Sequence, residues 1–341
     1  MTYSITAIIP AHNEADIIAK TIHSLQVNGC DNIIVANDNS TDNTYEIAES
    51  LGVTVFNTIN NTGRKAGALN QALTQYIDHR NSDQYIFIVD ADTVINDDWV
   101  AHARPLLDNN SFDAVGSIFH ADNRSGYLRY MQYLEWERYA FQVSRSQKVF
   151  VLTGTASLIR LSKLEAVYAL TGHYYDEDGI TEDFAMTIDL KNVGTRMISP
   201  QSTIAFTETM PSFRLLYLQR RRWYLGALQQ VFSRQFSKIM WPYLGQQMML
   251  FITMIAFGLI IIANAYLILT NQYAFSLFWW FILLAFATER LITVWHLGWH
   301  ARIVAVTLIP ELLYTYILQI SYLGAWIQFV SGSNGTWNHL D

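Results

Sequence analysis

Two carboxylates one residue apart, Asp90 and Asp92, follow an apolar run in the stretch FIVDADTVINDDW (Phe87–Trp99). Aspartate is common where strands end, because its side chain favours turns. Carboxylate oxygens are also the ligands that Mg²⁺ uses together with substrate phosphates. The spacing alone leaves two interpretations open: a turn, and a divalent metal site that receives a phosphorylated ligand.

Two further stretches could do chemistry. ITEDFAM (Ile180–Met186) carries the carboxylate Asp183, a type of side chain that can accept a proton. On its residues alone, this stretch is more simply a helix start, where acidic side chains are favourable. QRRRWYLGALQQ (Gln219–Gln230) contains Arg222, whose guanidinium can bind an anion bidentately, and Trp223, whose ring can stack on an apolar surface. Its alternative is an amphipathic helix whose basic face meets lipid headgroups.

The elements before these residues must position them. Apolar, strand-like runs at residues 5–10, 32–38, 53–58 and 85–92 alternate with helical patterns. Repeated strand–helix units predict an α/β domain built on a parallel sheet, with helices on both faces. Ligands bind such sheets beyond the carboxyl ends of the strands. The polar residues at those ends should therefore form one site.

The strand ends carry chemically coherent side chains. PAHNE (Pro10–Glu14) follows the first strand, Asp38 ends the second, Lys65 lies near a helix start, and Asp90 and Asp92 end the fourth. A carboxylate can accept the N–H of a base, a lysine can meet a diphosphate, and an acidic pair can hold a metal. Taken singly, the second strand end is also a turn with a helix N-cap, and the lysine is also a solvated surface residue.

Composition narrows the class of protein. The chain has 341 residues, a net charge of −7 and 15% charged residues, below the usual share of about 25%. The negative net charge makes nucleic acid a poor general partner. The single cysteine, Cys30, excludes an intramolecular disulfide and suits a reducing compartment. The N-terminus lacks a basic segment followed by a long apolar run, so we expect no secretory signal.

The C-terminal third predicts membrane helices. Residues 239–288 contain no Asp, Glu, Lys, Arg or His, and a spanning helix needs about 20 apolar residues. We expect spans at about 243–269, 275–299 and 303–330; a buried helical core is the alternative. Basic residues before the first span and at Arg302 predict a cytoplasmic N-terminal part.

The third apolar segment has a second interpretation. Pro310 and Glu311 favour a re-entrant or interfacial helix, which would return the tail (331–341) to the cytoplasmic side. Intramembrane charges usually face a partner, so we expect an ion pair between Arg290 and Glu311.

The ordered set PAHNE, NDNS, GRKAGALN, DAD, ITED and QRRRW resembles the family 2 glycosyltransferases. More narrowly, it is similar to the membrane-embedded synthases of cellulose, chitin, hyaluronan and poly-N-acetylglucosamine. The resemblance runs from about Ala7 through Trp223 and continues into membrane helices. It implies a GT-A type catalytic domain (1–204), interfacial amphipathic helices (205–240) and a transmembrane region (241–341).

The resemblance also implies residue roles on the donor side. Asp38 would meet uracil, although Asn37 stands where many relatives carry a second acidic residue. Asp92 and Asp90 would hold Mg²⁺ or Mn²⁺ at the diphosphate. The residues implied to contact the UDP-sugar donor are Ala11, Glu14, Asp38, Lys65, Asp90, Gln219 and Arg222.

On the acceptor side, the resemblance implies that Asp183 is the catalytic base of an inverting transfer. The implied acceptor-binding residues are Gly154, Thr155, Glu182 and Trp223. The expected donor is UDP-N-acetylglucosamine, with UDP-glucose as a rival, and the expected acceptor is a growing β-linked glycan. Alternatives are a single transfer to polyprenyl phosphate or another lipid-linked acceptor, and a non-catalytic membrane subunit. About three spans are few for one copy to form its own export channel. The expected partners are therefore membrane lipids and either a second copy of the chain or an export partner.

Overall fold

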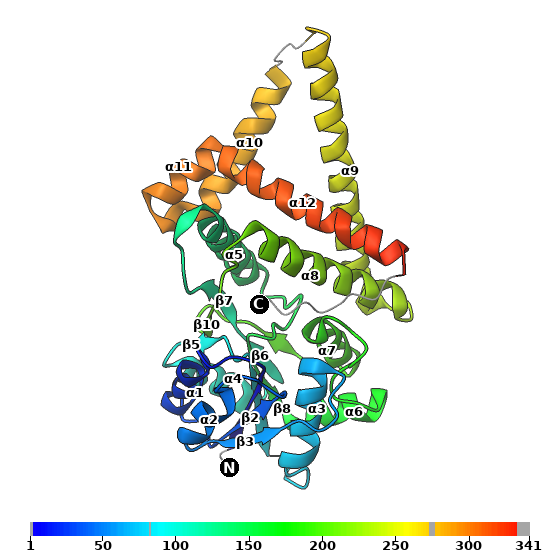
Figure 1. Cartoon of the computed structure of the whole chain (residues 1–341). Helices are drawn as coiled ribbons and strands as arrows, with labels where there is room; N and C mark the ends of the chain where they lie inside the picture. The colour runs from blue at the N-terminus through cyan, green and yellow to red at the C-terminus, as the bar shows by residue number, and fades with distance from the viewer. Residues whose placement is uncertain (1–2, 82, 273–276, 333–341) are drawn as a thin grey trace. The chain divides into compact units, whose positions relative to one another are not determined.

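The computed structural model describes residues 3–81, 83–272 and 277–332 (Figure 1). These residues form two compact units, Met1–Arg124 with Tyr139–Thr209 and Ser125–Arg138 with Met210–Asp341. Helix α5 (Gly126–Ser146) contributes residues to both. The predicted tail lies outside the described residues from position 333 onward.

The first unit is built on a seven-stranded sheet in the order β3-β2-β1-β4-β8-β6-β9. Its strands are β1 (Ser4–Ala11), β2 (Asn32–Asn37), β3 (Thr54–Asn57), β4 (Gln84–Val89), β6 (Ala114–Gly116), β8 (Ala156–Arg160) and β9 (Met197–Ile198). The first four in chain order pair in parallel, as predicted. The sheet as a whole is mixed, because β8 runs antiparallel to β4 and to β6. The fully parallel sheet expected from the strand–helix repeat is therefore wrong beyond β4, where that repeat ends.

Alternating side chains of the central strands enter two separate cores. Phe87 of β4 packs on one face of the sheet, while Ile86 and Ile88 pack on the other. One face is covered by α1 (Ile18–Val27), α2 (Thr44–Ser50) and α4 (Trp99–Asp108); the other by α3 (Arg64–Tyr76), α6 (Leu161–Thr171) and α7 (Glu182–Asn192). A strand buried on both faces reads as a continuous apolar run, which explains why β1 and β4 were recognisable in the sequence.

A second, three-stranded sheet of the same unit has the order β5-β10-β7. Its strands are β5 (Val94–Ile95), β7 (Ile118–Ala121) and β10 (Ile204–Thr207). β5 follows directly on the loop that carries Asp90 and Asp92, and it pairs antiparallel with β10. This pairing places that loop close to β10 and to Glu208, the residue that follows β10.

The second unit is helical. It contains α8 (Phe213–Ser233), η1 (Lys238–Met240), α9 (Trp241–Leu269), α10 (Leu277–Val294), η2 (Trp295–Leu297), α11 (Trp299–Thr307) and α12 (Ile309–Val330). Within the described residues, two helices, Lys238–Leu269 and Trp279–Leu297, are long and apolar enough to cross a membrane. These two agree with the first two predicted spans.

The third predicted span is not one straight helix. α11 and α12 meet at an angle of 71°, with Leu308 between them in a left-handed conformation (φ 57°). Pro310 accounts for the break, since its ring would clash with a carbonyl one turn earlier if α11 continued. The pair therefore counts as a span only if a broken helix crosses the bilayer.

Helix α12 packs along α8, as Figure 1 shows. Its side facing α8 includes buried Tyr314, Ser321 and Tyr322, whereas large apolar side chains on its other side are exposed, among them Ile309, Leu313, Ile320 and Ile327. A helix with one packed side and one exposed apolar side suits a membrane surface. This pattern favours the interfacial interpretation of the third segment.

Buried charges of the second unit are paired. Glu311 lies 2.7 Å from Arg138 Nη1 and 3.0 Å from Arg290 Nε, so the predicted Arg290–Glu311 pair is confirmed and gains a third member. Glu135 Oε2 lies 2.7 Å from Arg220 Nη2 and accepts a hydrogen bond from the Tyr314 hydroxyl. Such pairing offsets the cost of removing each charge from water.

Candidate functional site

The loops after β1 and β2 lock together. Asp38 donates its backbone N–H to the carbonyl of Ala11 at 2.7 Å, and His12 Nδ1 donates to the carbonyl of Asp38 at 2.6 Å. Asn13, in a left-handed conformation, binds both the Ser40 hydroxyl and the Thr41 N–H. Hydrogen bonds therefore hold the loops after β1 and β2 together, and Asp38 lies in the second of these loops.

The carboxylate of Asp38 is held by two neighbours. Its Oδ1 accepts hydrogen bonds from the Thr58 hydroxyl at 2.6 Å and from Asn61 Nδ2 at 2.8 Å. Asn61 also donates to the carbonyl of Arg64, the first residue of α3. Gly67 makes room for it, since a Cβ there would lie 2.0 Å from Asn61 Oδ1. Asn61 thus links the aspartate to the start of the helix that carries Lys65.

Lys65 forms ion pairs with carboxylates from two different elements. Its Nζ lies 2.5 Å from Asp90 Oδ1, at the end of β4, and 2.7 Å from Glu182 Oε1, in the first turn of α7. Burial alone would lower the pKa of Lys65, but the carboxylates of Asp90, Glu182 and Asp183 more than offset this effect and raise it well above its usual value. The lysine is therefore a fixed positive charge at this point.

Asp183 is oriented by the start of α7. Its Oδ1 accepts the backbone N–H of Phe184 at 2.8 Å, and its Oδ2 lies 3.4 Å from the backbone nitrogen of Gly154. A Cβ on Gly154 would lie 2.7 Å from Lys65 Nζ and 3.4 Å from Asp90 Oδ2. Only glycine lets the backbone come this near to the cluster.

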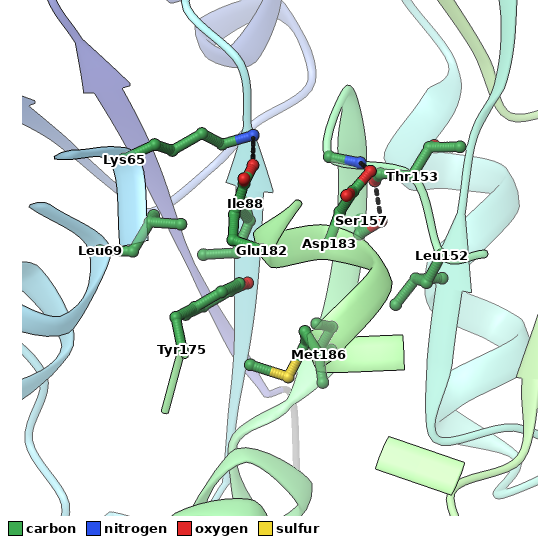
Figure 2. Close-up of a pocket in the computed structure, with 12 residues that line it drawn as sticks. Lys65, Leu69, Ile88, Leu152, Thr153, Ser157, Tyr175, Glu182, Asp183 and Met186 are labelled. Carbon is green, nitrogen blue, oxygen red and sulfur yellow. Dashed lines mark hydrogen bonds and ion pairs between the residues drawn. The ribbon is translucent and has the colours of Figure 1, made fainter. Parts of the chain in front are cut away.

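A pocket lies beside these groups. Lys65, Glu182 and Asp183 line its polar side, Leu69 and Met186 line its apolar side, and Tyr175 points its hydroxyl toward the acidic residues (Figure 2). The structure therefore brings together five of the predicted site residues: Lys65, Asp90, Gly154, Glu182 and Asp183.

The site holds more negative than positive charge. Burial raises the pKa of Asp90 to about 6 despite Lys65, and burial together with Glu182 raises that of Asp183 to about 6. Burial raises the pKa of Glu14 to about 8, with further contributions from Asp92, Asp90 and Glu208. Carboxylates that repel one another in this way favour a cation among them.

The donor set fits a divalent metal completed by a ligand. Within residues 3–81, 83–272 and 277–332, no three His, Cys, Asp or Glu side chains form a ready-made metal cage. Mg²⁺ is usually held by one or two carboxylates plus substrate phosphates and waters. Asp90 and Asp92, whose pKa values are both raised by burial, supply two such hard oxygen ligands.

The remaining predicted residues are placed as follows. Ala11 and Glu14 lie at the end of β1 and in the loop after it, Asp92 lies next to β5, and the Thr155 carbonyl accepts the N–H of Asp90 at 3.1 Å. Gln219, Arg222 and Trp223 all lie on α8 in the second unit.

On α8, the tryptophan has a partner that sequence reasoning missed. The guanidinium of Arg220 lies over the Trp223 ring, 4.3 Å from its centroid. Arg220 is buried and held by Glu135 and Tyr314. Gln219 has a buried Oε1 without a hydrogen-bond partner among the described residues.

Other functional neighbours were also missed: Asn61, Asn70, Tyr175 and Glu208. Asn70 ends the motif GRKAGALN and Asn61 lies two residues before it, so their positions on either side of Lys65 were a usable signal. Tyr175 and Glu208 gave none, because only the folded chain brings them to the cluster.

The architecture is that of an α/β domain with a mixed sheet, and its charged cluster lies beside the ends of β1 and β4. Residues 6–168 match the family described as Glycosyl transferase family 2. A mannosyltransferase from Pyrobaculum calidifontis, solved with GDP-Man and Mn²⁺, superposes with a TM-score of 0.64 at 18% identity, covering 98% of this chain and 88% of that one. Residues 6–168 therefore form a glycosyl transferase family 2 domain, and the chain has a GT-A type fold.

Relatives in sequence are named as polysaccharide synthases. The chain is 30% identical over 247 residues to the poly-beta-1,6-N-acetyl-D-glucosamine synthase of Staphylococcus aureus, covering 69% of this chain and 57% of the relative. It is 26% identical over 299 residues to the synthase of that name from Staphylococcus epidermidis, covering 85% of this chain and 65% of the relative. The chain thus spans less than two thirds of the length of these relatives.

Proposed function

We propose that the chain transfers a sugar, with inversion, from a UDP-sugar to a growing β-linked glycan at the cytoplasmic face of a membrane. The observation that carries this proposal is the Lys65 bridge. One partly buried lysine joins Asp90, on the predicted donor side, to Glu182, next to the predicted base. In this proposal, donor and acceptor meet at this one cation.

On the donor side, Asp38 has the position and the restraint needed to accept an N–H group of a base. Its Oδ1 is engaged by Thr58 and Asn61, which leaves Oδ2 as the oxygen for the nucleotide in this proposal. Lys65 then supplies positive charge for the diphosphate. Asp90 and Asp92 would hold Mg²⁺ or Mn²⁺, which neutralises negative charge on a leaving diphosphate.

Asp183 acts as the general base. As the acceptor oxygen forms its bond to the anomeric carbon, the bond from that carbon to the diphosphate oxygen breaks, and UDP leaves with the electron pair. The proton of the acceptor hydroxyl passes to Asp183, whose raised pKa makes the carboxylate a better proton acceptor than an exposed aspartate. One displacement inverts the anomeric centre, so an α-linked donor yields a β-linkage.

UDP-N-acetylglucosamine is the proposed donor sugar. It is supported by the names of the Staphylococcus relatives, which are poly-beta-1,6-N-acetyl-D-glucosamine synthases, and by the QRRRW stretch on α8. Placement at a membrane is supported by the two apolar helices and the exposed apolar side of α12. A cytoplasmic catalytic domain is supported by the basic residues before α9.

A donor screen tests the proposal. Purified protein in detergent is incubated with radiolabelled UDP-N-acetylglucosamine, UDP-glucose and GDP-mannose, with Mg²⁺, with Mn²⁺ or with excess chelator, and the product is sized. We expect high-molecular-weight label from UDP-N-acetylglucosamine that disappears with chelator. Label confined to a polyprenyl-linked monosaccharide would replace polymer synthesis by single-sugar transfer. Nucleotide binding without release of nucleoside diphosphate under any condition would overturn catalysis.

A further inference from the structure

Two adjacent amide side chains of α3 each hold a backbone segment outside the helix. Asn70 accepts the N–H of Tyr175 at 2.8 Å and donates to its carbonyl at 2.9 Å. Gln71 accepts the N–H of Ile59 at 2.9 Å and donates to its carbonyl at 3.0 Å. The hydrogen-bonding pattern is the same, but the two segments lead to different parts of the site.

The segment held by Asn70 leads to the predicted base. Residues 175–181 connect Tyr175 to α7, whose first turn carries Glu182 and Asp183. Asn70 Nδ2 also donates to Glu177 Oε1 at 2.7 Å. Glu177 in turn packs on Gly63, where a Cβ would lie 2.6 Å from its Oε2. The segment therefore lies along α3 on both sides of Lys65.

Tyr175 connects this backbone clamp to the pocket. Its ring is buried and lines the pocket together with Lys65, Glu182 and Asp183 (Figure 2). A side chain this large shifts when its backbone shifts, because packed interiors leave little free space. Movement at residue 175 would therefore reach the Lys65–Glu182 ion pair and the first turn of α7.

We propose that Asn70 is a positioning residue for catalysis: by clamping Tyr175 and Glu177 to α3, it sets the place of Asp183 relative to Lys65. This inference rests on the proposed role of Asp183. It assigns Asn70 to the transfer step and not to donor binding. Misplacing a catalytic group by about 1 Å can cost on the order of 100-fold in rate.

The test compares Asn70→Asp with the matched control Gln71→Glu. Each substitution keeps the shape of the side chain and removes its N–H donors, so each loses hydrogen bonds to a backbone carbonyl. Asn70→Asp also places a carboxylate against Glu177. We expect Asn70→Asp to lower kcat at least tenfold with less than a threefold change in the KM for the donor. We expect Gln71→Glu to leave kcat within twofold.

A second variant separates positioning from a general loss of structure. Adding Glu177→Gln to Asn70→Asp replaces the repulsion between two carboxylates with an amide that can donate to the carboxylate introduced on α3, so kcat should recover severalfold. Equal loss of kcat in Asn70→Asp and Gln71→Glu would overturn the proposal. So would a loss of kcat that follows a lowered unfolding temperature in both.

Hydrogen exchange gives a readout that does not need turnover. In Asn70→Asp, the peptide covering residues 173–185 should exchange faster than in the wild type, while Gln71→Glu should leave it unchanged. A wild-type protein that transfers no sugar contradicts the proposed function. Unchanged exchange in Asn70→Asp contradicts the positioning role, whether or not the wild type is active.

Discussion

The two units of the molecule treat buried charge in opposite ways. In the first, a single lysine, Lys65, faces the carboxylates of Asp90, Glu182 and Asp183. In the second, Arg138 and Arg290 meet Glu311, and Arg220 meets Glu135. The first cluster carries a surplus of negative charge, and the second group is close to balanced.

This difference suggests a chemical role for the first cluster and a structural role for the second. Buried ion pairs that balance offset their own desolvation and hold helices in place. A surplus of carboxylates destabilises the site that contains it, and it persists where a cation or a reacting group uses it. Removing a charge from the first cluster should therefore cost activity, and removing a charge from the second should cost stability.

The largest effect on activity is expected from Asp183→Asn. The amide cannot accept the proton, so transfer should fall at least about 100-fold, while UDP binding persists. Because one carboxylate of the surplus disappears, the unfolding temperature should stay the same or rise. Transfer is measured by UDP release, and UDP binding by calorimetry. Asp178→Asn, an exposed change in the preceding loop, is the control; full turnover in Asp183→Asn would remove this residue from the role of base.

The reverse result is expected from Arg138→Met in the second unit. Glu311 is almost fully buried and, among the described residues, would keep Arg290 as its ion-pair partner. Breaking a buried pair costs about 3–5 kcal/mol when the remaining charge is left uncompensated. Because Arg290 still faces Glu311, the loss should be smaller than this, and the unfolding temperature in detergent should still fall. Transfer per folded molecule should change less than in Asp183→Asn. Unchanged unfolding together with lost turnover would reverse the comparison between the two units.

The pH dependence of transfer gives a smaller, graded test. Asp183 must be ionised to accept a proton, and burial with Glu182 raises its pKa to about 6. Activity should therefore be half-maximal near pH 6, approach its full value about one pH unit higher, and fall by about tenfold per pH unit well below pH 6, as a single titrating base requires. The measurement is kcat/KM for the donor between about pH 4.5 and 8 at saturating metal. A flat profile across the region around pH 6 would exclude a base with this pKa.

The smallest effect is expected from Arg220→Lys. Lysine keeps the charge that faces Glu135 but loses the flat surface that lies over Trp223. We expect a severalfold loss of transfer with little change in stability. In a Trp223→Ala background, the same change should have no further effect on transfer, because the two residues act through one contact. Additive losses would show that Arg220 acts by another route.

Much of the catalytic unit could be predicted because its signals are local. β1, β2 and β4 are apolar runs ending in polar residues, and the rule that ligands bind at strand ends brought Lys65 and Asp90 into one site. The ITED stretch on α7 could be connected to that site only through the ordered family motifs. The GT-A type fold was predicted on the same basis.

What could not be predicted depends on contacts distant in sequence. The antiparallel direction of β8 follows from its pairing with β4 and β6, which has no signature in the strand itself. Arg220 precedes Trp223 by one helical turn, yet nothing in QRRRW tells which arginine faces the ring. The 71° bend between α11 and α12 was foreshadowed by Pro310, but hydropathy alone made them one span.

Gly154 has a consequence for how this sequence can change over time. A methyl group at this position would meet Lys65, Asp90 and Asp183, from three separate elements, within 2.7–3.6 Å. Gly245 and Gly258 in α9 have open space at the same point. Among active descendants of this chain, Gly154 should resist replacement while the two helical glycines drift to alanine or serine. A record of tolerated mutations would thus mark the proposed meeting point of donor and acceptor without any structure at all.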